Sequence, residues 1–210
     1  MPAAADPDVG AVYTAEDRLA RWFGLGTVTV FGTRWALEPE VVFARVPDVQ
    51  RYVDRVLTHL ATQSWREPSG AALTPVAVRA RRGARKAHYD QARHTIAIPP
   101  AERGGAWALR ESVVLHELAH HLCAVHASSP ASRTTPVPDT CVTTRAPSTS
   151  CASRTPHTAG TSSASGRNHA PAEPPHGPHF RRTLLVLLTE AGHPTASALL
   201  RIAFADEGLA

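Results

Sequence analysis

Apolar residues recur at helix-like or strand-like intervals along much of the chain. Helices are predicted where these residues return every three or four positions, in residues 14–23, 47–60, 111–125, 178–191 and 196–205. Strands are predicted where β-branched and aromatic residues cluster, in residues 27–31, 41–44, 76–80 and 94–98. Thr14 is a candidate N-cap of the first helix, and Pro47 opens the second. Strands and helices mixed in this order predict an α+β domain.

One long polar segment interrupts the pattern. Residues 127–175 contain no Leu, Ile, Met, Phe, Tyr or Trp, and 18 of these 49 residues are Ser or Thr. Such a segment buries too little apolar surface to offset the entropy of ordering, so we expect a disordered insertion rich in Ser, Thr, Pro and Ala. Residues 176–210 are too few to fold alone. The sequence therefore predicts a single domain formed by residues 1–126 and 176–210.

Composition excludes several classes of protein. The net charge is +4, but Lys86 is the only lysine among 22 basic residues, a bias typical of a GC-rich genome, so nucleic-acid binding is only weakly supported. Three cysteines are too few for a disulfide framework. No apolar run approaches the ~18 residues of a membrane-spanning helix. The first residues are acidic and lack a basic region before an apolar stretch, so a cytoplasmic location is expected.

The helix predicted at residues 111–125 carries the pattern H-E-x-x-H as His116, Glu117 and His120. Residues four apart share one face of a helix, so both imidazoles can reach one metal ion while Glu117 lies near its open side. Zinc held by three protein ligands keeps a position for water and lowers the pKa of that water. The motif therefore indicates zinc-dependent hydrolysis, with Glu117 as the general base.

A third metal ligand has to come from elsewhere in the chain, and the candidates follow residue 175. His176 and His179 lie at the start of the next predicted helix, and Glu190 lies further along it. His121 adjoins His120 but points about 100° around the helix, so we expect it to pack or to support the site.

The two histidine motifs resemble those of a family of small actinobacterial zinc metallohydrolases related to SprT-like minimal zincins. Its pattern is H-E-L-A-H-H-L followed by H-G-P-x-F, which residues 116–122 and 176–180 match, and the resemblance extends over most of the chain outside 127–175. It implies a minimal zincin-like fold with a small mixed sheet and two C-terminal helices. It also implies that His116, His120 and His176 bind Zn²⁺, with Phe180 packing nearby. In this family a short loop joins the two motifs, whereas 56 positions separate His120 from His176 here.

Other residues have candidate roles that are less specific. The resemblance implies that strand 94–98 is a sheet edge that binds extended substrate. His88 and Tyr89 are candidate donors to a developing oxyanion. A basic cluster is interpreted as a solvated face, with phosphate or nucleic-acid contact as the alternative: Arg79, Arg81, Arg82, Arg85 and Lys86. Cys123 is expected to be a small buried side chain, and His157 and His169 to be solvated.

The leading hypothesis is a zinc-dependent hydrolase, in particular a metallopeptidase acting on a peptide or protein, with no membrane partner. Two alternatives stay open. The chain could be a non-catalytic protein that is stabilised by metal or associated with nucleic acid. It could also be an inactive family member whose site is disrupted by residues 127–175. The sequence leaves the substrate and the oligomeric state open.

Overall fold

The structure is a computed structural model that describes residues 6–63, 73–128 and 173–209. These residues belong to one compact unit, built from the chain on both sides of residues 129–172. The unit is a mixture of α-helices and short strands, which confirms the predicted α+β class. In chain order the elements are α1 (Val9–Leu25), β1 (Thr27–Val30), β2 (Thr33–Ala36), α2 (Val46–Thr62), β3 (Ala77–Ala80), β4 (His88–Asp90), β5 (Thr95–Ile98), α3 (Glu111–Ser128), α4 (Pro178–Glu190) and α5 (Pro194–Asp206).

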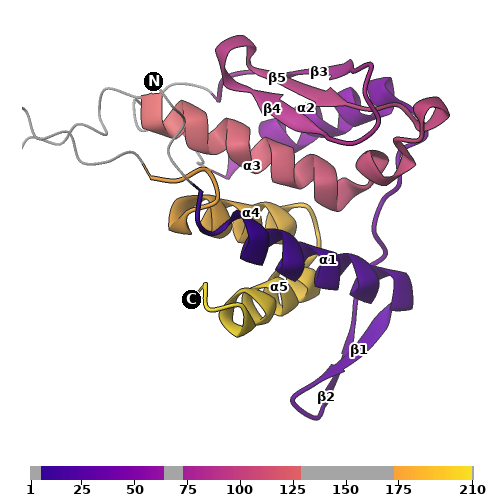
Figure 1. The fold of residues 1–210 in the computed structure, drawn as a ribbon, viewed down its shortest axis with the longest axis vertical. Helices are drawn as coiled ribbons and strands as arrows, with labels where there is room; N and C mark the ends of the chain where they lie inside the picture. The colour runs from indigo at the N-terminus through magenta and orange to yellow at the C-terminus, as the bar shows by residue number, and fades with distance from the viewer. Residues whose placement is uncertain (1–5, 64–72, 129–172, 210) are drawn as a thin grey trace, which may run out of the picture. The chain divides into compact units, whose positions relative to one another are not determined.

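A three-stranded mixed sheet has the strand order β3-β5-β4 (Figure 1). β5 pairs parallel with β3 and antiparallel with β4, and all four of its residues are buried. The expectation that strand 94–98 forms the sheet edge is therefore wrong. β4, which the strand pattern missed, is an edge of this sheet.

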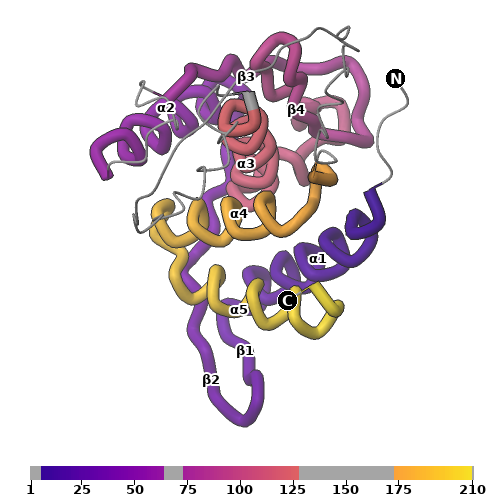
Figure 2. The backbone as a smooth tube through the Cα atoms, turned by 90° about the vertical axis from the view of Figure 1, so that its left-hand side faces the viewer, coloured from indigo at the N-terminus to yellow at the C-terminus, as the bar shows by residue number. Residues whose placement is uncertain are grey.

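β1 and β2 form a separate antiparallel hairpin that extends beyond α1 (Figures 1 and 2). Its turn is Phe31-Gly32, where both residues have positive φ values of 50° and 74°. Positive φ at both central residues matches the twist of a two-residue hairpin turn. The strand predicted at residues 41–44 is wrong, since Val42 makes only an isolated bridge to Arg110.

The five predicted helices are confirmed, with shifted ends. In α2 the expected apolar face is buried: Val49, Tyr52, Val53, Val56 and Leu60. α1 begins at Val9, so Thr14 is not its N-cap, and the Thr14 hydroxyl instead donates to the carbonyl oxygen of Gly10 within the helix. This hydrogen bond to the preceding turn explains how threonine is accommodated inside a helix.

The helices pack in a connected series. α4 contacts both α3 and α5, and α5 contacts α1 (Figure 2). α2 packs against β3, and α3 packs against β4. One core joins these elements, with fully buried side chains that include Leu60, Ile96, Leu118, Leu187 and Leu199. Burial of each such side chain stabilises the fold by about 1.5–3 kcal/mol.

The predicted insertion, residues 127–175, lies almost wholly outside the described residues. α3 continues to Ser128, and the described chain resumes at Glu173. His157 and His169 also lie outside it. Among the helices of the described chain, none combines the length and the apolar character needed to span a membrane.

Candidate metal centre

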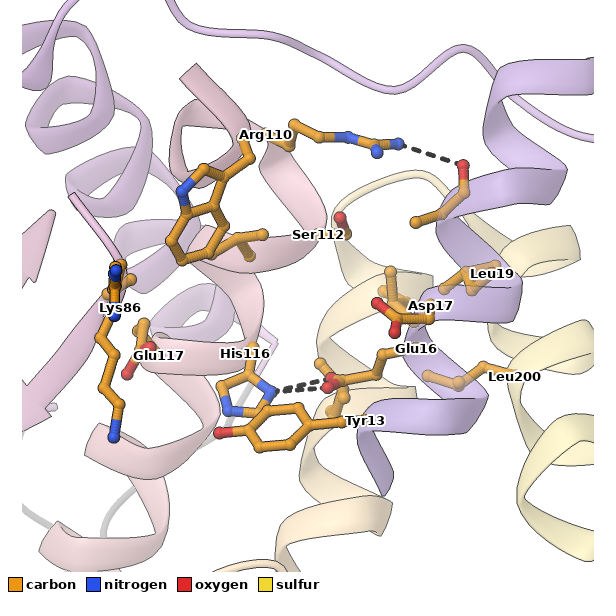
Figure 3. A pocket seen from close by; sticks show the side chains of 17 residues that line it. Tyr13, Glu16, Asp17, Leu19, Lys86, Arg110, Ser112, His116, Glu117 and Leu200 are labelled. Atoms are coloured by element: carbon orange, nitrogen blue, oxygen red, sulfur yellow. Dashed lines mark hydrogen bonds and ion pairs between the residues drawn. The ribbon is translucent and has the colours of Figure 1, made fainter. Parts of the chain in front are cut away.

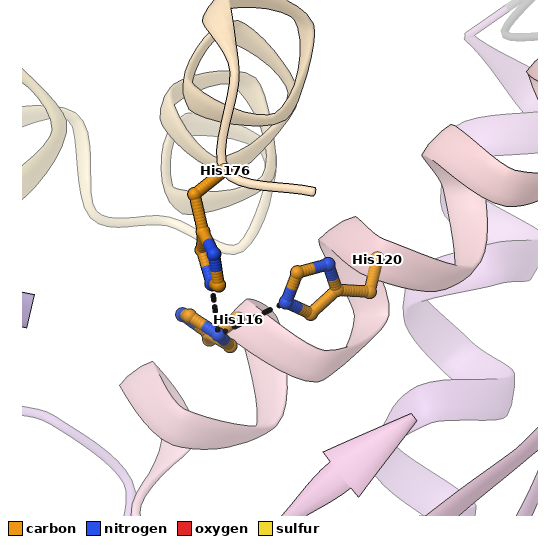
Figure 4. Close-up of side chains that lie close together, drawn as sticks. All are labelled: His116, His120 and His176. Carbon is orange, nitrogen blue, oxygen red and sulfur yellow. Dashed lines mark hydrogen bonds between the residues drawn. The ribbon is translucent and has the colours of Figure 1, made fainter. Parts of the chain in front are cut away.

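Three histidines converge beside α3 (Figure 4). His116 and His120 lie one turn apart on this helix, with their Nε2 atoms 3.2 Å from each other. His176, two residues before α4, places its Nε2 atom 3.4 Å from that of His116. The candidate ligand atoms of all three lie within 4.8 Å of one another. The three predicted ligands are thus brought close enough to hold a metal ion.

Local chain geometry fixes His176. The N–H of Gly177 donates to the carbonyl oxygen of Pro174 at 2.9 Å, which closes a turn around the histidine. A Cβ atom on Gly177 would lie 2.7 Å from the side chain of Glu173 and 3.0 Å from the Pro174 carbonyl oxygen, so glycine permits the close approach. Arg181 donates to the carbonyl oxygen of His176 at 3.1 Å.

Carboxylates bind the outer nitrogens of two of these imidazoles. The Nδ1 atom of His116 lies 2.8 and 3.0 Å from the two carboxylate oxygens of Glu16, on α1 (Figure 3). The Nδ1 atom of His176 lies 2.5 Å from Asp6 Oδ2. An Nδ1–H that donates to a carboxylate leaves Nε2 as an unprotonated lone pair in the neutral ring. Both lone pairs then point toward the same place.

Burial and charge set the pKa values of the two helix histidines in opposite directions. Burial alone would lower the pKa of His116, but the charge and hydrogen bond of Glu16 raise it overall. Burial lowers the pKa of His120 to about 2, helped by His116 and His176. His120 is therefore a neutral imidazole at physiological pH, the form in which histidine binds metals.

Two aromatic rings enclose the cluster. Phe180, buried at the start of α4, contacts all three imidazoles, with ring centroids 5.0 Å from His116, 4.5 Å from His120 and 4.8 Å from His176. Tyr13, on α1, stacks on His116 with the ring centroids 5.7 Å apart. Phe180 thus forms the buried side of the cluster, as its expected packing role requires.

Glu117 lines a cavity of about 470 Å³ together with His116. The carboxylate is buried, with the residue only 5% exposed, and this burial raises its pKa despite the charge of His116 and a hydrogen bond from the Tyr89 backbone. The other lining residues include Tyr13 and Glu16 of α1 and also Arg85, Lys86 and Trp107. A carboxylate of raised pKa at the wall of a cavity is suited to proton transfer.

The rival third ligands lie elsewhere. The ring of His179 packs against that of His126, with centroids 5.0 Å apart, and its backbone N–H donates to Glu173. Glu190, at the end of α4, lies 3.0 Å from His59. Of the three candidates, only His176 is in the histidine cluster.

His121 belongs to a separate buried network. Its Nε2 atom lies 2.8 Å from the Thr74 carbonyl oxygen, and its Nδ1 atom lies 3.1 Å from the Tyr89 hydroxyl. That hydroxyl also lies 3.0 Å from His94 Nδ1. The network ties α3 to β4, so His121 has the packing role expected of it. Tyr89 is not among the residues that line the cavity.

The basic cluster divides between two environments. The Arg81 guanidinium donates to the Lys86 carbonyl oxygen at 2.6 Å. It also lies 3.1 Å from Nδ1 of His88, so this contact already uses one ring nitrogen of the expected oxyanion donor. Arg85 and Lys86 line the cavity, whereas Arg79 and Arg82 are exposed and do not. Cys123 is partly buried, and burial raises the pKa of its thiol to about 11.

Sequence reasoning missed Asp6, Tyr13 and Glu16. All three lie about 100 or more positions before the histidines that they contact. No local pattern marks an acidic or aromatic residue on a distant helix as a partner of these imidazoles, so the sequence held no signal for them.

Comparison of the chain with protein-family models, with curated proteins and with solved structures found no match in any of the three.

Proposed function

We propose that the protein is a metal-dependent hydrolase, with His116, His120 and His176 as the ligands of a zinc ion. The observation that carries this proposal is the convergence of three imidazole Nε2 atoms, two of them on rings whose Nδ1 atoms face carboxylates. A tetrahedral ion with metal–nitrogen bonds of about 2.0–2.1 Å separates two ligand nitrogens by about 3.3 Å. The distances of 3.2 and 3.4 Å fit that geometry.

A proton is a poorer occupant of this cluster than a divalent ion. A proton on Nε2 of His116 could form a hydrogen bond to the Nε2 atom of either His120 or His176. The Nε2 lone pair of the other histidine would then stay without a hydrogen bond among buried groups. Two carboxylates, Glu16 and Asp6, hold negative charge behind the rings and favour a cation between them. Neutral imidazoles supported by carboxylates are a donor set that suits zinc.

Catalysis is favoured over a purely structural metal site. Structural zinc sites are closed by four protein ligands, whereas the described residues supply three, beside a buried carboxylate on a cavity wall. The alternative that residues 127–175 disrupt the site is disfavoured. His176, which follows this segment in the chain, lies next to the two α3 histidines.

Each residue of the site has its own role in the proposed hydrolysis. His116, His120 and His176 hold the ion, which supplies Lewis acidity when bound. Glu117 accepts a proton from the attacking water and returns it to the leaving group, and its raised pKa suits both transfers. The resemblance of both histidine motifs to small zinc metallohydrolases related to SprT-like zincins supports a peptide or protein substrate.

A glutamine at position 117 tests the proposal. Glu117→Gln preserves the shape of the side chain but removes the base, so we expect normal zinc content and at least about a 100-fold loss of activity. Cleavage of fluorescently labelled casein and zinc content by mass spectrometry are measured on the same samples, with Asp54→Asn on α2 as the control. Full activity in Glu117→Gln would contradict the proposed base.

A further inference from the structure

Tyr13 stands on the exposed side of the histidine cluster. Its ring stacks on His116 at an interplanar angle of 20° and meets His176 edge-on, with centroids 5.4 Å apart. The residue is 50% exposed, whereas Phe180, on the other side of the same rings, is 2% exposed. Tyr13 is therefore the aromatic residue that a molecule entering from solvent would meet next to the proposed ligands.

The phenol is directed toward the catalytic side of the cavity. Figure 3 shows the Tyr13 ring across the face of His116, with its hydroxyl end toward α3, the helix of Glu117. Tyr13 and Glu117 both line the cavity. Burial raises the pKa of Tyr13, and the carboxylate of Glu117 is the largest of the charges that add to this increase.

α1 holds the ring in this position. Glu16, one turn after Tyr13, bonds to Nδ1 of His116, so the same helix fixes both the ligand and the phenol beside it. Arg18 forms ion pairs with Asp206 and Glu207 at the end of α5, which anchors the helix. The position of the Tyr13 hydroxyl is thus fixed by a helix that is held in place through the Glu16–His116 contact.

We propose that Tyr13 is a catalytic residue whose hydroxyl donates a hydrogen bond to the carbonyl oxygen of the substrate as that oxygen gains negative charge. This inference rests on the proposed hydrolase function. A preformed donor of this kind stabilises the transition state more than the ground state, because the negative charge develops only as the reaction proceeds.

In a peptide substrate, hydrolysis breaks the C–N bond of the amide and adds water across it. The oxygen of water bonds to the carbonyl carbon, one water proton passes to Glu117, and the C=O electron pair moves onto the oxygen that Tyr13 contacts. The C–N bond then breaks as that pair returns, and Glu117 gives its proton to the departing nitrogen. The second water proton stays with the carboxylic acid product.

Other donors near the site are less well placed for this role. The Tyr89 hydroxyl lies within hydrogen-bond distance of His94 and His121, and Nδ1 of His88 lies within hydrogen-bond distance of Arg81. Arg85 and Lys86 line the same cavity, but both are exposed. Among these candidates, Tyr13 alone contacts the proposed ligands.

Removal of the hydroxyl tests the inference. Tyr13→Phe and the control Tyr52→Phe, a core tyrosine on α2, are loaded with zinc and titrated calorimetrically with acetohydroxamate, a small chelator whose oxyanion mimics the developing charge. Because a hydrogen bond to a charged group is lost, we expect binding about 10-fold or more weaker in Tyr13→Phe, with zinc content unchanged. Casein cleavage should fall about 100-fold in Tyr13→Phe and stay at the wild-type rate in Tyr52→Phe.

Several outcomes would overturn the assignment. Equal hydroxamate affinity in wild type and Tyr13→Phe, absence of binding in zinc-loaded wild type, or loss of zinc from Tyr13→Phe would each exclude the proposed hydrogen bond. Wild-type protein that takes up no zinc would overturn the hydrolase proposal as well. Zinc content therefore distinguishes failure of the Tyr13 inference from failure of the function.

Discussion

Both carboxylate oxygens of Glu16 lie within hydrogen-bond distance of His116 Nδ1, at 2.8 and 3.0 Å, across 100 positions of sequence. The contact sets the tautomer of the ring and turns the Nε2 lone pair toward His120 and His176. It joins α1 to α3 at the proposed ligand itself, and the charge of Glu16 makes that ligand a stronger base.

Loss of the Glu16 carboxylate should weaken zinc binding without unfolding the protein. We expect Glu16→Ala to reduce the affinity about 10- to 100-fold, because the ring loses both its orientation and the neighbouring charge. Glu16→Gln should lose less zinc affinity, since its amide oxygen can still accept a hydrogen bond from Nδ1–H of His116. Competition with a chromophoric chelator measures the affinity, with Asp54→Asn as the control, and an unchanged affinity in Glu16→Ala would exclude the orienting role.

Alanine should have opposite effects on stability at two glycines, Gly105 in the turn before α3 and Gly24 on α1. A Cβ atom on Gly105 would lie 2.3 Å from the carbonyl oxygen of Pro99, a backbone atom that cannot move away cheaply. Gly105→Ala should therefore lower the free energy of unfolding by about 1–3 kcal/mol. Gly24→Ala, on an exposed part of α1 with no atom within 4 Å of the new Cβ, should raise it by about 0.5–1 kcal/mol. Urea unfolding of both variants checks the signs, and equal stabilities would contradict the packing at Gly105.

The buried pair of His193 and Glu111 predicts how stability depends on pH. Their side chains lie 2.8 Å apart, and the hydrogen bond to Glu111 raises the pKa of His193 above 6.5. For Glu111, burial alone would raise the pKa, but the hydrogen bond from His193, together with one from the Val41 backbone N–H, lowers it below 4.5. The His193 contribution is complete below pH 6.5 and is lost as the pH rises through the folded pKa. The Glu111 contribution is complete above pH 4.5 and is lost as the pH falls through the folded pKa.

The pair should therefore stabilise the fold most between about pH 4.5 and 6.5. Breaking it in His193→Gln should cost about 3 kcal/mol at pH 5.5, and the difference from wild type should shrink toward pH 9. Urea unfolding at several pH values measures that difference and cancels the titration of other histidines. A difference that grows with pH would have the wrong sign for this pair.

The apolar pattern predicted the helices well because each buries a continuous face, as the buried residues of α2 show. Short strands were harder to predict. β2 and β4 have three or four residues that are mostly exposed or half-buried, so their sequences carry little alternation. The position of β5 inside the sheet depends on pairing with β4, which the sequence pattern did not reveal.

The site was predictable only where its chemistry is local. His116, Glu117 and His120 lie within one turn and a half of a helix, so their spacing alone indicates a shared face. His176 was selected by a motif resemblance, and its meeting with His116 depends on how α4 packs against α3. Glu16 and Tyr13 on α1, and Asp6 before it, reach the site through tertiary packing alone. By sequence they are indistinguishable from solvated residues.

Zinc stoichiometry decides whether the three histidines form a metal site. Wild type, His116→Ala, His176→Ala and the matched control His179→Ala are dialysed against a zinc buffer, and bound metal is counted by mass spectrometry after circular dichroism has shown that each is folded. We predict one zinc ion per chain in wild type and in His179→Ala, and a loss of tight zinc binding in His116→Ala and His176→Ala. Wild type without bound zinc, or His176→Ala with a full ion, would contradict this prediction.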